Sequence, residues 1–261
     1  MQTRASRHRI LGLAALSILL PACGGPKSSS TSGPQGGPVP TNRITINLRV
    51  EAIDDAPVVV RANLNDGKLA GASYRLDGGD FLRACISGVC RSMADNDSIF
   101  TPDYIARFDY QAGVDYVVSF NRQKAQDAPD SRVKLPPGFS IVTPVNHQPV
   151  NDGDTVAFSW SPAGAPARVS LNYAADCTMA SGTHTFAGGS LADDSDANGR
   201  EAVPIDPVLN FIRSGATSNI TRCSIDVIVS HELQGRIDTA FDHGYALGIV
   251  SHTVRLDYLP R

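Results

Sequence analysis

The sequence holds few of the residue patterns that carry catalysis. It has six histidines in 261 residues, and none stands in a His-Glu-x-x-His motif, since His231-Glu232 is followed by glycine at position 235. Neither a Gly-x-Ser-x-Gly elbow nor a Gly-x-x-x-x-Gly-Lys loop occurs. These motifs supply the zinc ligands, nucleophile or phosphate cradle of large enzyme classes. We therefore expect no enzyme, and a hydrolase whose site is assembled from distant loops is kept as an alternative.

Aromatic residues are also scarce, at 7% of the chain, and Trp160 is the single tryptophan. It lies in period-two register with Val156 and Phe158, so we expect it in a core rather than on a sugar-binding platform. A glycan-binding surface would need exposed rings elsewhere. The candidates for such rings are Tyr104, Phe241 and Tyr245.

Positive charge is in deficit. The chain has 23 Lys and Arg against 26 Asp and Glu, a formal net charge of −3. Residues 1–22 contain three of the arginines and no acidic residue, so their removal would leave a net charge of −6. An acidic balance disfavours nucleic acid and an anionic lipid surface as partners. We predict no nucleic-acid partner.

The apolar run near the start of the chain is too short to span a bilayer. Ile10–Leu20 has eleven residues, against the roughly 20 that a membrane helix needs. It follows a basic segment that contains Arg4, Arg7 and Arg9, and small residues then lead to Cys23. This order of zones is typical of a secretory signal peptide.

The stretch Leu20-Pro21-Ala22-Cys23 resembles the lipobox of the type II signal peptide of bacterial lipoproteins, with proline as its one departure. The resemblance implies a cleaved signal peptide over residues 1–22 and lipid on Cys23, with palmitate as one attached chain. Two or more chains hold a protein firmly on a membrane. Because Gly24 and not Asp follows the cysteine, the resemblance implies anchoring in the outer membrane, facing the periplasm or the cell surface.

Residues 23–42 join this predicted anchor to the rest of the chain. After the cysteine they are almost all Gly, Pro, Ser, Thr and other polar residues. Such a composition cannot bury a core. We predict a flexible linker with an end-to-end distance of roughly 25 Å.

Four cysteines remain besides Cys23, and an exported chain lies in an oxidising compartment. Four cysteines allow three pairings. We favour Cys85–Cys90 and Cys177–Cys223, because each pair falls within one predicted domain. A zinc site of four thiolates is disfavoured, because the spacings match no common zinc module.

From residue 43 onward, apolar and polar residues alternate. Runs of period two occur over 44–51, 58–64, 106–110, 114–121, 156–161, 168–173, 223–229 and 250–258. Such alternation indicates half-buried antiparallel strands. Pro136-Pro137 interrupts the pattern, since proline cannot donate to a sheet ladder. The predicted fold class is all-β, with two antiparallel β-sandwich domains over residues 43–135 and 138–261.

Thr155–Pro162 and Val169–Tyr173 resemble strands B and C of fibronectin type III and other immunoglobulin-like sandwiches, where a tryptophan and a tyrosine pack in the core. The likeness covers roughly residues 139–173, with weaker support from 222–258. Residues 178–221 depart from it, because they are too long for an ordinary loop. Within them, 206–213 is predicted as a short helix with Asp206 as its N-cap.

One loop within that departure has the spacing of a calcium site. Asp194, Asp196 and Asn198 follow the 1-3-5 pattern that opens a calcium loop, and Gly199 occupies the turn position. Position twelve is Ile205 and not Glu, so Glu201 is the expected substitute ligand, with Asp206 as the alternative. The hypothesis is a weak structural calcium ion, and the alternative is a solvated acidic turn. No other cofactor is predicted.

Three histidines, His231, His243 and His252, are expected to have no catalytic role. His252 falls on the apolar face of the last run and is expected as a hydrogen-bonded core residue. His231 and His243 are expected beside or within an exposed loop over 235–243. The sequence therefore favours a lipid-anchored envelope protein whose sandwich modules bind another envelope protein or give structural support. A glycan- or peptidoglycan-binding lipoprotein is the alternative.

Overall fold

The structure is a computed structural model. It describes residues 39–54, 56–66, 73–96, 102–163, 168–195, 198–214 and 219–260, without the side chains of 193–195. Contacts divide the chain into residues 1–37 and 38–261, and all described residues belong to the second unit. The predicted signal peptide, lipidated Cys23 and most of the linker lie outside the described residues.

The described part is almost entirely β-structure, which confirms the all-β fold class. One 3-10 turn, η1 (Thr41–Arg43), and one α-helix, α1 (Asp206–Ser214), accompany the strands. The strands are β1 (Thr45–Ile53), β2 (Val58–Asn65), β3 (Phe81–Ile86), β4 (Val89–Ser92), β5 (Ala94–Asp95), β6 (Asp103–Phe108), β7 (Asp115–Asn121), β8 (Ala128–Lys134), β9 (Ser140–Thr143), β10 (Gln148–Val150), β11 (Thr155–Ser161), β12 (Arg168–Met179), β13 (His184–Ser195), β14 (Arg200–Pro204), β15 (Ile220–Gln234) and β16 (His243–Tyr258).

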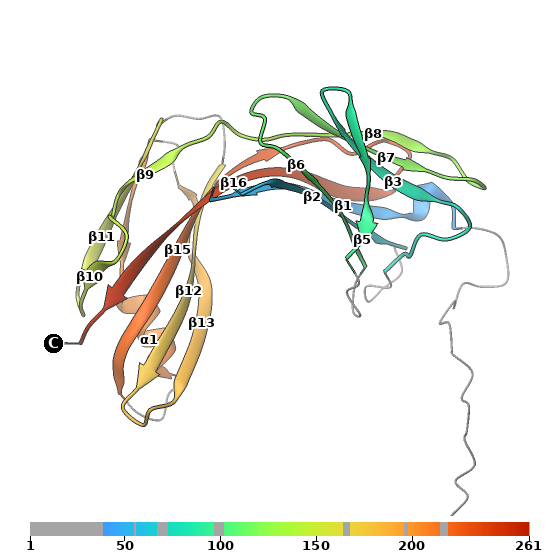
Figure 1. Cartoon of the computed structure of the whole chain (residues 1–261). Helices are drawn as coiled ribbons and strands as arrows, with labels where there is room; N and C mark the ends of the chain where they lie inside the picture. Colours follow the sequence, from blue (N-terminus) through green and yellow to red (C-terminus); the bar gives the residue numbers. More distant parts are fainter. Residues whose placement is uncertain are drawn as a thin grey trace, which may run out of the picture. The chain divides into compact units, whose positions relative to one another are not determined.

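The first half of the chain forms one two-layered sandwich. A four-stranded sheet in the order β4-β3-β7-β8 covers the strands β5, β6, β2, β1 and the start of β16 (Figure 1). Rings from the two layers meet between them: Phe108 of β6 lies edge-on to Tyr116 of β7, with centroids 6.2 Å apart. The alternating residues of β1, β2 and β7 supply the buried side of each layer.

The second half forms a further sandwich. The three-stranded sheet β14-β11-β9 faces the strands β13, β12, β15 and β16, and β10 pairs with the end of β16 (Figure 1). Trp160 of β11 is 4% exposed, and its ring lies edge-on to His231 of β15 at 6.1 Å. The strands that resemble B and C are β11 and β12, and they lie in opposite sheets. Trp160 is therefore a core residue, as its register predicts.

The two sandwiches share one sheet. The path β13-β12-β15-β16-β1-β2-β6-β5 is continuous, and β16 is the strand that joins its two parts. β1 pairs with β16 in parallel, from Thr45 opposite His243 to Ile53 opposite Ser251. The antiparallel pattern predicted from the sequence does not include this parallel pair. The division into domains at residues 135–138 stays a prediction.

Glycines permit the close approach of β16 to its neighbours. A Cβ atom at Gly244 would collide with the carbonyl oxygen of Ile46 in β1, and its φ is 147°. A Cβ atom at Gly248 would collide with the carbonyl oxygen of Lys134 at the end of β8. Side chains at these two positions would therefore push β16 away from both layers of the first sandwich.

The segment that departs from the fibronectin pattern is structured. Residues 178–221 contain β13, β14 and α1 in addition to the ends of two strands. The predicted helix is confirmed, and Val208, Leu209 and Ile212 form its buried side. Asp206 at its start accepts a hydrogen bond from the Gly153 N–H at 2.8 Å, which ties the helix to the turn before β11.

Both favoured disulfides are present. Cys85 and Cys90 are directly opposite each other in the β3–β4 hairpin, whose turn residues Ser87 and Gly88 have φ values of 47° and 82°. Cys177 of β12 and Cys223 of β15 are also cross-strand partners. In the described residues, no helix is long and apolar enough to cross a membrane.

Candidate functional site

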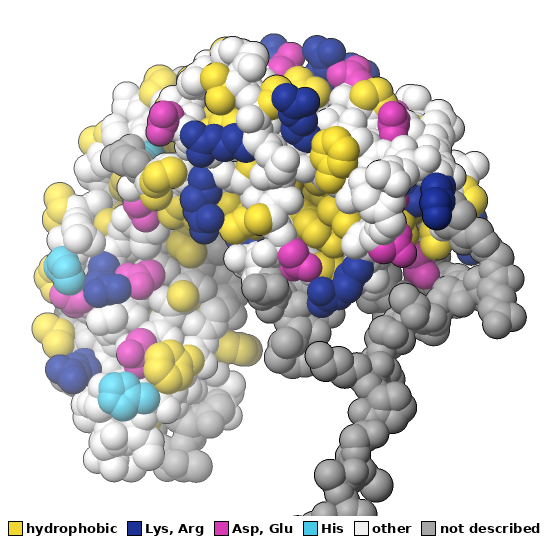
Figure 2. All heavy atoms as spheres, turned by 45° about the vertical axis from the view of Figure 1, so that its right-hand side comes forward, with side chains coloured by type: hydrophobic (Ala, Val, Ile, Leu, Met, Phe, Trp, Pro, Cys, Tyr) yellow, Lys and Arg dark blue, Asp and Glu magenta, His cyan; other side chains and the backbone are white. Residues whose placement is uncertain are grey.

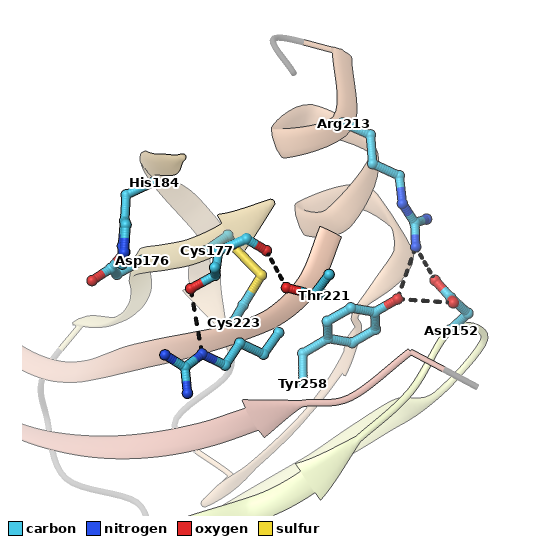
Figure 3. Close-up of a disulfide and its surroundings, with 10 residues drawn as sticks. Asp152, Asp176, Cys177, His184, Arg213, Thr221, Cys223 and Tyr258 are labelled. Carbon is cyan, nitrogen blue, oxygen red and sulfur yellow. Dashed lines mark hydrogen bonds and ion pairs between the residues drawn. A yellow bond between two sulfur atoms is a disulfide. The ribbon is translucent and has the colours of Figure 1, made fainter. Parts of the chain in front are cut away.

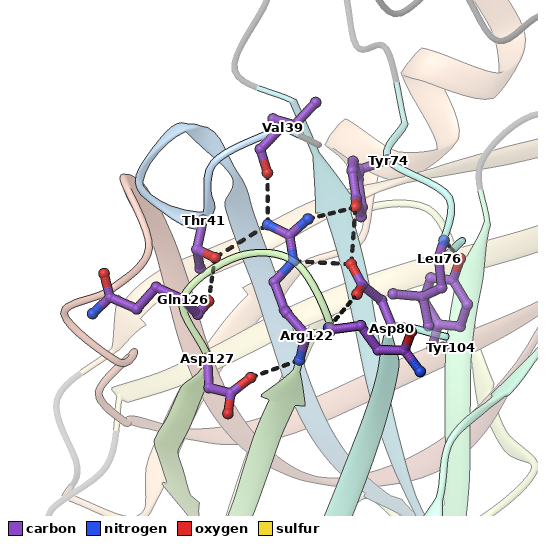
Figure 4. Close-up of polar contacts among 10 residues, drawn as sticks. Val39, Thr41, Tyr74, Leu76, Asp80, Tyr104, Arg122, Gln126 and Asp127 are labelled. Carbon is purple, nitrogen blue, oxygen red and sulfur yellow. Dashed lines mark hydrogen bonds and ion pairs between the residues drawn. The ribbon is translucent and has the colours of Figure 1, made fainter. Parts of the chain in front are cut away.

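A buried arginine fastens the end of the linker to the first sandwich (Figure 4). The Arg122 side chain follows β7 and is fully buried beside Asp80, with Nε 2.9 Å from the carboxylate. Its Nη1 donates to the carbonyl oxygen of Val39 at 2.7 Å and to the Thr41 hydroxyl at 3.1 Å. Its Nη2 donates to the Tyr74 hydroxyl at 2.8 Å. The first described residues of the chain are therefore held by one guanidinium group, which we call the Arg122 clamp.

The clamp is shielded from water by aromatic rings. The guanidinium carbon lies 4.9 Å from the ring centroid of Phe120 and 5.5 Å from that of Tyr74. Burial, as the largest cause, raises the pKa of Tyr74 to about 12. Tyr74 therefore stays a neutral donor and acceptor at any physiological pH. Its own hydroxyl lies 3.2 Å from Asp80, so the network closes on itself.

The outer face of the first sandwich carries a polar surface, which we call the polar face. It surrounds a depression of about 350 Å³. Its residues are Asn47, Arg49, Glu51, Arg61, Asn63, Asp103 and Tyr245.

The register of the strands sets four of these residues in one row. Asn47 is opposite Tyr245 on one side and Asn63 on the other, and Asn63 is opposite Asp103. Because neighbouring strands are about 4.8 Å apart, the row is about 14 Å long. Tyr245 is 37% exposed and supplies the aromatic ring at one end. The row thus presents amide, carboxylate and aromatic groups to solvent.

Neighbouring side chains fix the polar face in place. Arg61 lies 2.9 Å from the Asp103 carboxylate. The Asn63 amide donates to the carbonyl oxygen of Pro102 at 3.1 Å. Arg49 lies over the Tyr245 ring at 5.8 Å. A surface whose polar groups are already oriented loses less rotamer entropy when it binds a partner.

A pocket of about 410 Å³ lies where the two sandwiches join. We call it the junction pocket. It is lined by Ala52, Asp54, Ala56, Tyr110, Gly138, Phe139, Ser140, Ser161, Val250, Ser251 and His252. The Tyr110 hydroxyl donates to the carbonyl oxygen of Pro136 at 3.3 Å, which holds the Pro-Pro-Gly segment beside it. This size is in the range of small-molecule sites.

His252 differs from its prediction as a hydrogen-bonded core residue. Its side chain is 21% exposed in the junction pocket, and its Nδ1 lies 3.6 Å from the Asp54 carboxylate. Asp54 is held by the backbone of β16, since its Oδ1 accepts the Thr253 N–H at 2.8 Å. Its φ of 45° is one that aspartate and asparagine adopt more readily than most residues.

The interpretation of His231 as an exposed loop residue is wrong. It lies within β15 and is 1% exposed. Its ring stacks on Phe139 with centroids 3.9 Å apart, behind the wall of the junction pocket. Neither ring nitrogen has a hydrogen-bond partner among the described residues. Burial, and to a lesser extent the charge of His252, lowers the pKa of His231 to about 4, so the ring is neutral at pH 7.

Figure 3 shows the Cys177–Cys223 disulfide. Cys223 borders a further depression, of about 430 Å³. His184 pairs there with Asp176 at 3.0 Å. Arg213 of α1 donates to the Tyr258 hydroxyl at 3.0 Å, and Tyr258 donates to Asp152 at 2.9 Å. These contacts fasten α1 to the sheet that contains the disulfide.

The predicted calcium ligands are described only in part. The side chains of Asp194 and Asp196 lie outside the described residues. Asn198 accepts the Arg200 N–H at 3.0 Å, and Glu201 lies in β14. No group of three or more His, Cys, Asp and Glu side chains in the described ranges is placed to hold a metal ion. The calcium site stays a prediction.

Two of the three aromatic candidates for a glycan surface are buried. Tyr104 is 4% and Phe241 is 5% exposed, and Tyr245 alone of the three reaches solvent. No sequence motif marks Asp54, Phe139 or Arg122 as functional residues. The alternation of β1 and β2 does identify the outward residues of the polar face, but not their pairing into a row.

No protein-family model matches the chain, and no curated protein does either. Among solved structures, the fibronectin(III)-like modules of CbhA from Clostridium thermocellum align over 82% of this chain and 94% of theirs, with 12% identity and a TM-score of 0.23. Domains A168–A170 of titin align over 80% of this chain and 64% of that structure, with 11% identity and a TM-score of 0.21. Likeness at this level carries no argument about fold or function.

Proposed function

We propose that this chain is a lipid-anchored protein of the bacterial outer membrane, with non-catalytic β-sandwich modules that bind another envelope protein or support an envelope assembly. The observation that carries the proposal is the stretch Leu20-Pro21-Ala22-Cys23, followed by a linker rich in Gly, Pro and Ser. Lipid on Cys23 would hold the modules at the membrane, and the linker would set their reach.

The Arg122 clamp supports the proposal. One buried side chain holds Val39 and Thr41, near the end of the predicted linker, through two hydrogen bonds, and it holds Asp80 and Tyr74 of the first sandwich through two more. Force on a membrane tether would therefore reach the fold at a buried site rather than at a free end. On the face that Figure 2 shows, acidic and basic side chains are interspersed with hydrophobic ones.

The anchor is tested by labelling cells with a palmitate analogue. The wild-type chain is expected to incorporate the label and to fractionate with the outer membrane, and Cys23→Ala is expected to abolish both. Cys85→Ala with Cys90→Ala is the matched control, because it removes cysteines but leaves the lipobox intact. A wild-type chain that is recovered unlabelled and water-soluble would remove the anchor.

The protein partner is sought by crosslinking in intact cells followed by mass spectrometry. We expect one or a few envelope proteins to be recovered with the wild-type chain. Recovery of cell-wall fragments without any protein would favour the second candidate function, which is binding of glycan or peptidoglycan.

The polar face supports that second candidate. Oriented amide, carboxylate and guanidinium groups beside an exposed ring are the groups that recognise hydroxyl-rich ligands. The row Tyr245–Asn47–Asn63–Asp103 would let one extended ligand contact four strands. Retention on isolated cell wall should fall about tenfold for Asn63→Ala with Tyr245→Ala. Phe186→Ala, at a 76% exposed ring outside the polar face, should leave it unchanged.

A further inference from the structure

We propose that the junction pocket binds a small organic cation, an ammonium group carried on an aromatic or short aliphatic body. The site is separate from the polar face: it lies at the ends of β1 and β9 and in the middle of β16, and it shares no residue with the polar row. Its cavity of about 410 Å³ is large enough for a small molecule.

The charge of the pocket lining favours a cationic ligand over an anionic one. Asp54 contributes a carboxylate to the lining, with the His252 Nδ1 3.6 Å from it, and no lysine or arginine is among the described residues that line the pocket. One of its oxygens accepts the Thr253 N–H, so the carboxylate has a fixed direction. An anion would meet this carboxylate, whereas an ammonium group can pair with it.

The aromatic lining favours the same class of ligand. Tyr110 and Phe139 both line the pocket, and aromatic faces attract cations through their quadrupoles. Both rings are held in place: Tyr110 by its bond to Pro136, and Phe139 by stacking on His231 at 3.9 Å. A pocket whose walls are preformed keeps more of its contact energy as affinity.

The lining also explains why the ligand needs an apolar body. Ala52, Ala56 and Val250 contribute apolar surface between the two rings and the carboxylate. Ser140 and Ser161 add hydroxyl groups, and the first donates only a long 3.5 Å bond to the carbonyl oxygen of the second. A fully hydrated ion such as sodium would gain little from these apolar walls. A ligand with one ammonium group and one apolar part would match them.

The proposal is tested by calorimetric titration of the full chain in detergent with 2-phenylethylammonium chloride and with its neutral analogue 2-phenylethanol. We expect the ammonium compound to bind about tenfold or more tightly than the alcohol. Equal affinity of the two compounds would overturn the proposal, and so would the absence of binding at about 10 mM ammonium compound.

A variant of the carboxylate makes the test specific to the site. Asp54→Asn keeps the acceptor for Thr253 and a side chain that tolerates the φ of 45°, so the fold should be retained. The substitution should weaken binding of the ammonium compound about tenfold and leave binding of the alcohol unchanged. Asp257→Asn, at an acidic residue outside the pocket that pairs with His147, should change neither affinity. Full affinity in Asp54→Asn would show that the carboxylate does not hold the cation.

A second variant covers the aromatic wall. Phe139→Leu keeps an apolar side chain but removes the ring. It should weaken binding of the ammonium compound more than binding of the alcohol. An equal loss for both compounds would mean that the wall serves only as apolar surface, which would contradict a cation held by aromatic faces. Tighter binding of Nα-acetyl-lysine methylamide than of the arylammonium compound would overturn the choice of a small molecule over a protein side chain.

Discussion

Arg122 and Asp80 form an ion pair at 2.9 Å in which the two side chains are only 0% and 7% exposed. Removal of one partner leaves the other charge buried and unpaired, which costs about 3–5 kcal/mol. Arg122→Met should therefore lower the free energy of unfolding by about that amount in urea titrations. Hydrogen exchange should also quicken at residues 41–44, because the Val39 and Thr41 contacts are lost.

The control for the clamp is an ion pair on the surface. Arg255 makes a bidentate ion pair with Asp226 at 2.6 and 2.8 Å, and the Arg255 side chain is 43% exposed. Arg255→Met should cost about 1 kcal/mol or less, because exposed pairs contribute little. Similar costs for the two variants would contradict a special role for the clamp.

His231 should make the stability of the protein depend on pH. Its pKa is lowered to about 4 in the folded chain, mainly by burial, against about 6.5 when unfolded. The unfolded chain therefore binds a proton first as the pH falls. The free energy of unfolding should drop by about 3 kcal/mol between pH 6.5 and pH 4 from this group alone. Urea titrations across this range measure the slope.

Two variants isolate the effect of His231. His231→Phe keeps a ring between Phe139 and Trp160 and removes the buried nitrogens, so it should flatten the slope between pH 6.5 and pH 4 and leave stability at pH 7 unchanged or higher. His243→Phe, at a side chain that is 76% exposed, should keep the wild-type slope. A wild-type slope in His231→Phe would assign the pH dependence to another group.

Local patterns account for most of what the sequence predicts. The alternation of 44–51, 58–64 and 114–121 predicts β1, β2 and β7 almost to the residue. Period two depends only on neighbouring residues, so one sequence suffices to see it. The same rule, carried two residues past Val229, places His231 on the buried side of β15, and ending the run too early caused that error.

Contacts between distant segments are what the sequence does not predict. The parallel pairing of β1 with β16 joins the two ends of the described chain, and no local pattern encodes it. β13 was missed because Gly188 and Gly189 interrupt its alternation, and both glycines lie tightly against Tyr173. The Arg122 clamp and the junction pocket collect side chains from several strands, so their residues become a group only in the folded chain.

The two disulfides should differ in their effect on stability. Cys177–Cys223 closes a sequence separation of 46 residues and Cys85–Cys90 one of 5. Loop-closure entropy then predicts a loss of about 4 kcal/mol for Cys177→Ala with Cys223→Ala, and about 2 kcal/mol for the other pair. Chemical unfolding of the two double variants measures both losses. A larger loss from the hairpin pair would show that strain or unfolded-state structure outweighs loop length.

The calcium prediction has a direct thermal test. Calcium at about ten times its dissociation constant should stabilise the wild-type chain by about 1.4 kcal/mol and raise its melting temperature relative to chelator. Asp194→Ala with Asp196→Ala should abolish the difference. Asp226→Ala, at an acidic residue of β15 outside that loop, should retain it. Identical melting with calcium and with chelator in the wild type would mean that the acidic turn is only solvated.

The shared sheet predicts how the chain behaves when it is cut at the proposed boundary. Residues 38–135 alone lack β16, and β1 then loses a parallel partner along its whole length. They also lose Phe241, which stacks on Phe120 at 5.9 Å, and Val250, which is 4% exposed. This fragment should therefore fail to fold on its own.

Mixing the fragment with residues 138–261 should restore its structure, because β16 is then supplied in trans. Dispersion of amide resonances in isotope-labelled 38–135, recorded before and after unlabelled 138–261 is added, measures this. A fragment of residues 138–242 serves as the control, since it lacks β16 and should not restore the structure of 38–135. Cooperative unfolding of 38–135 by itself would instead establish two domains that fold independently, with β16 adding only to their junction.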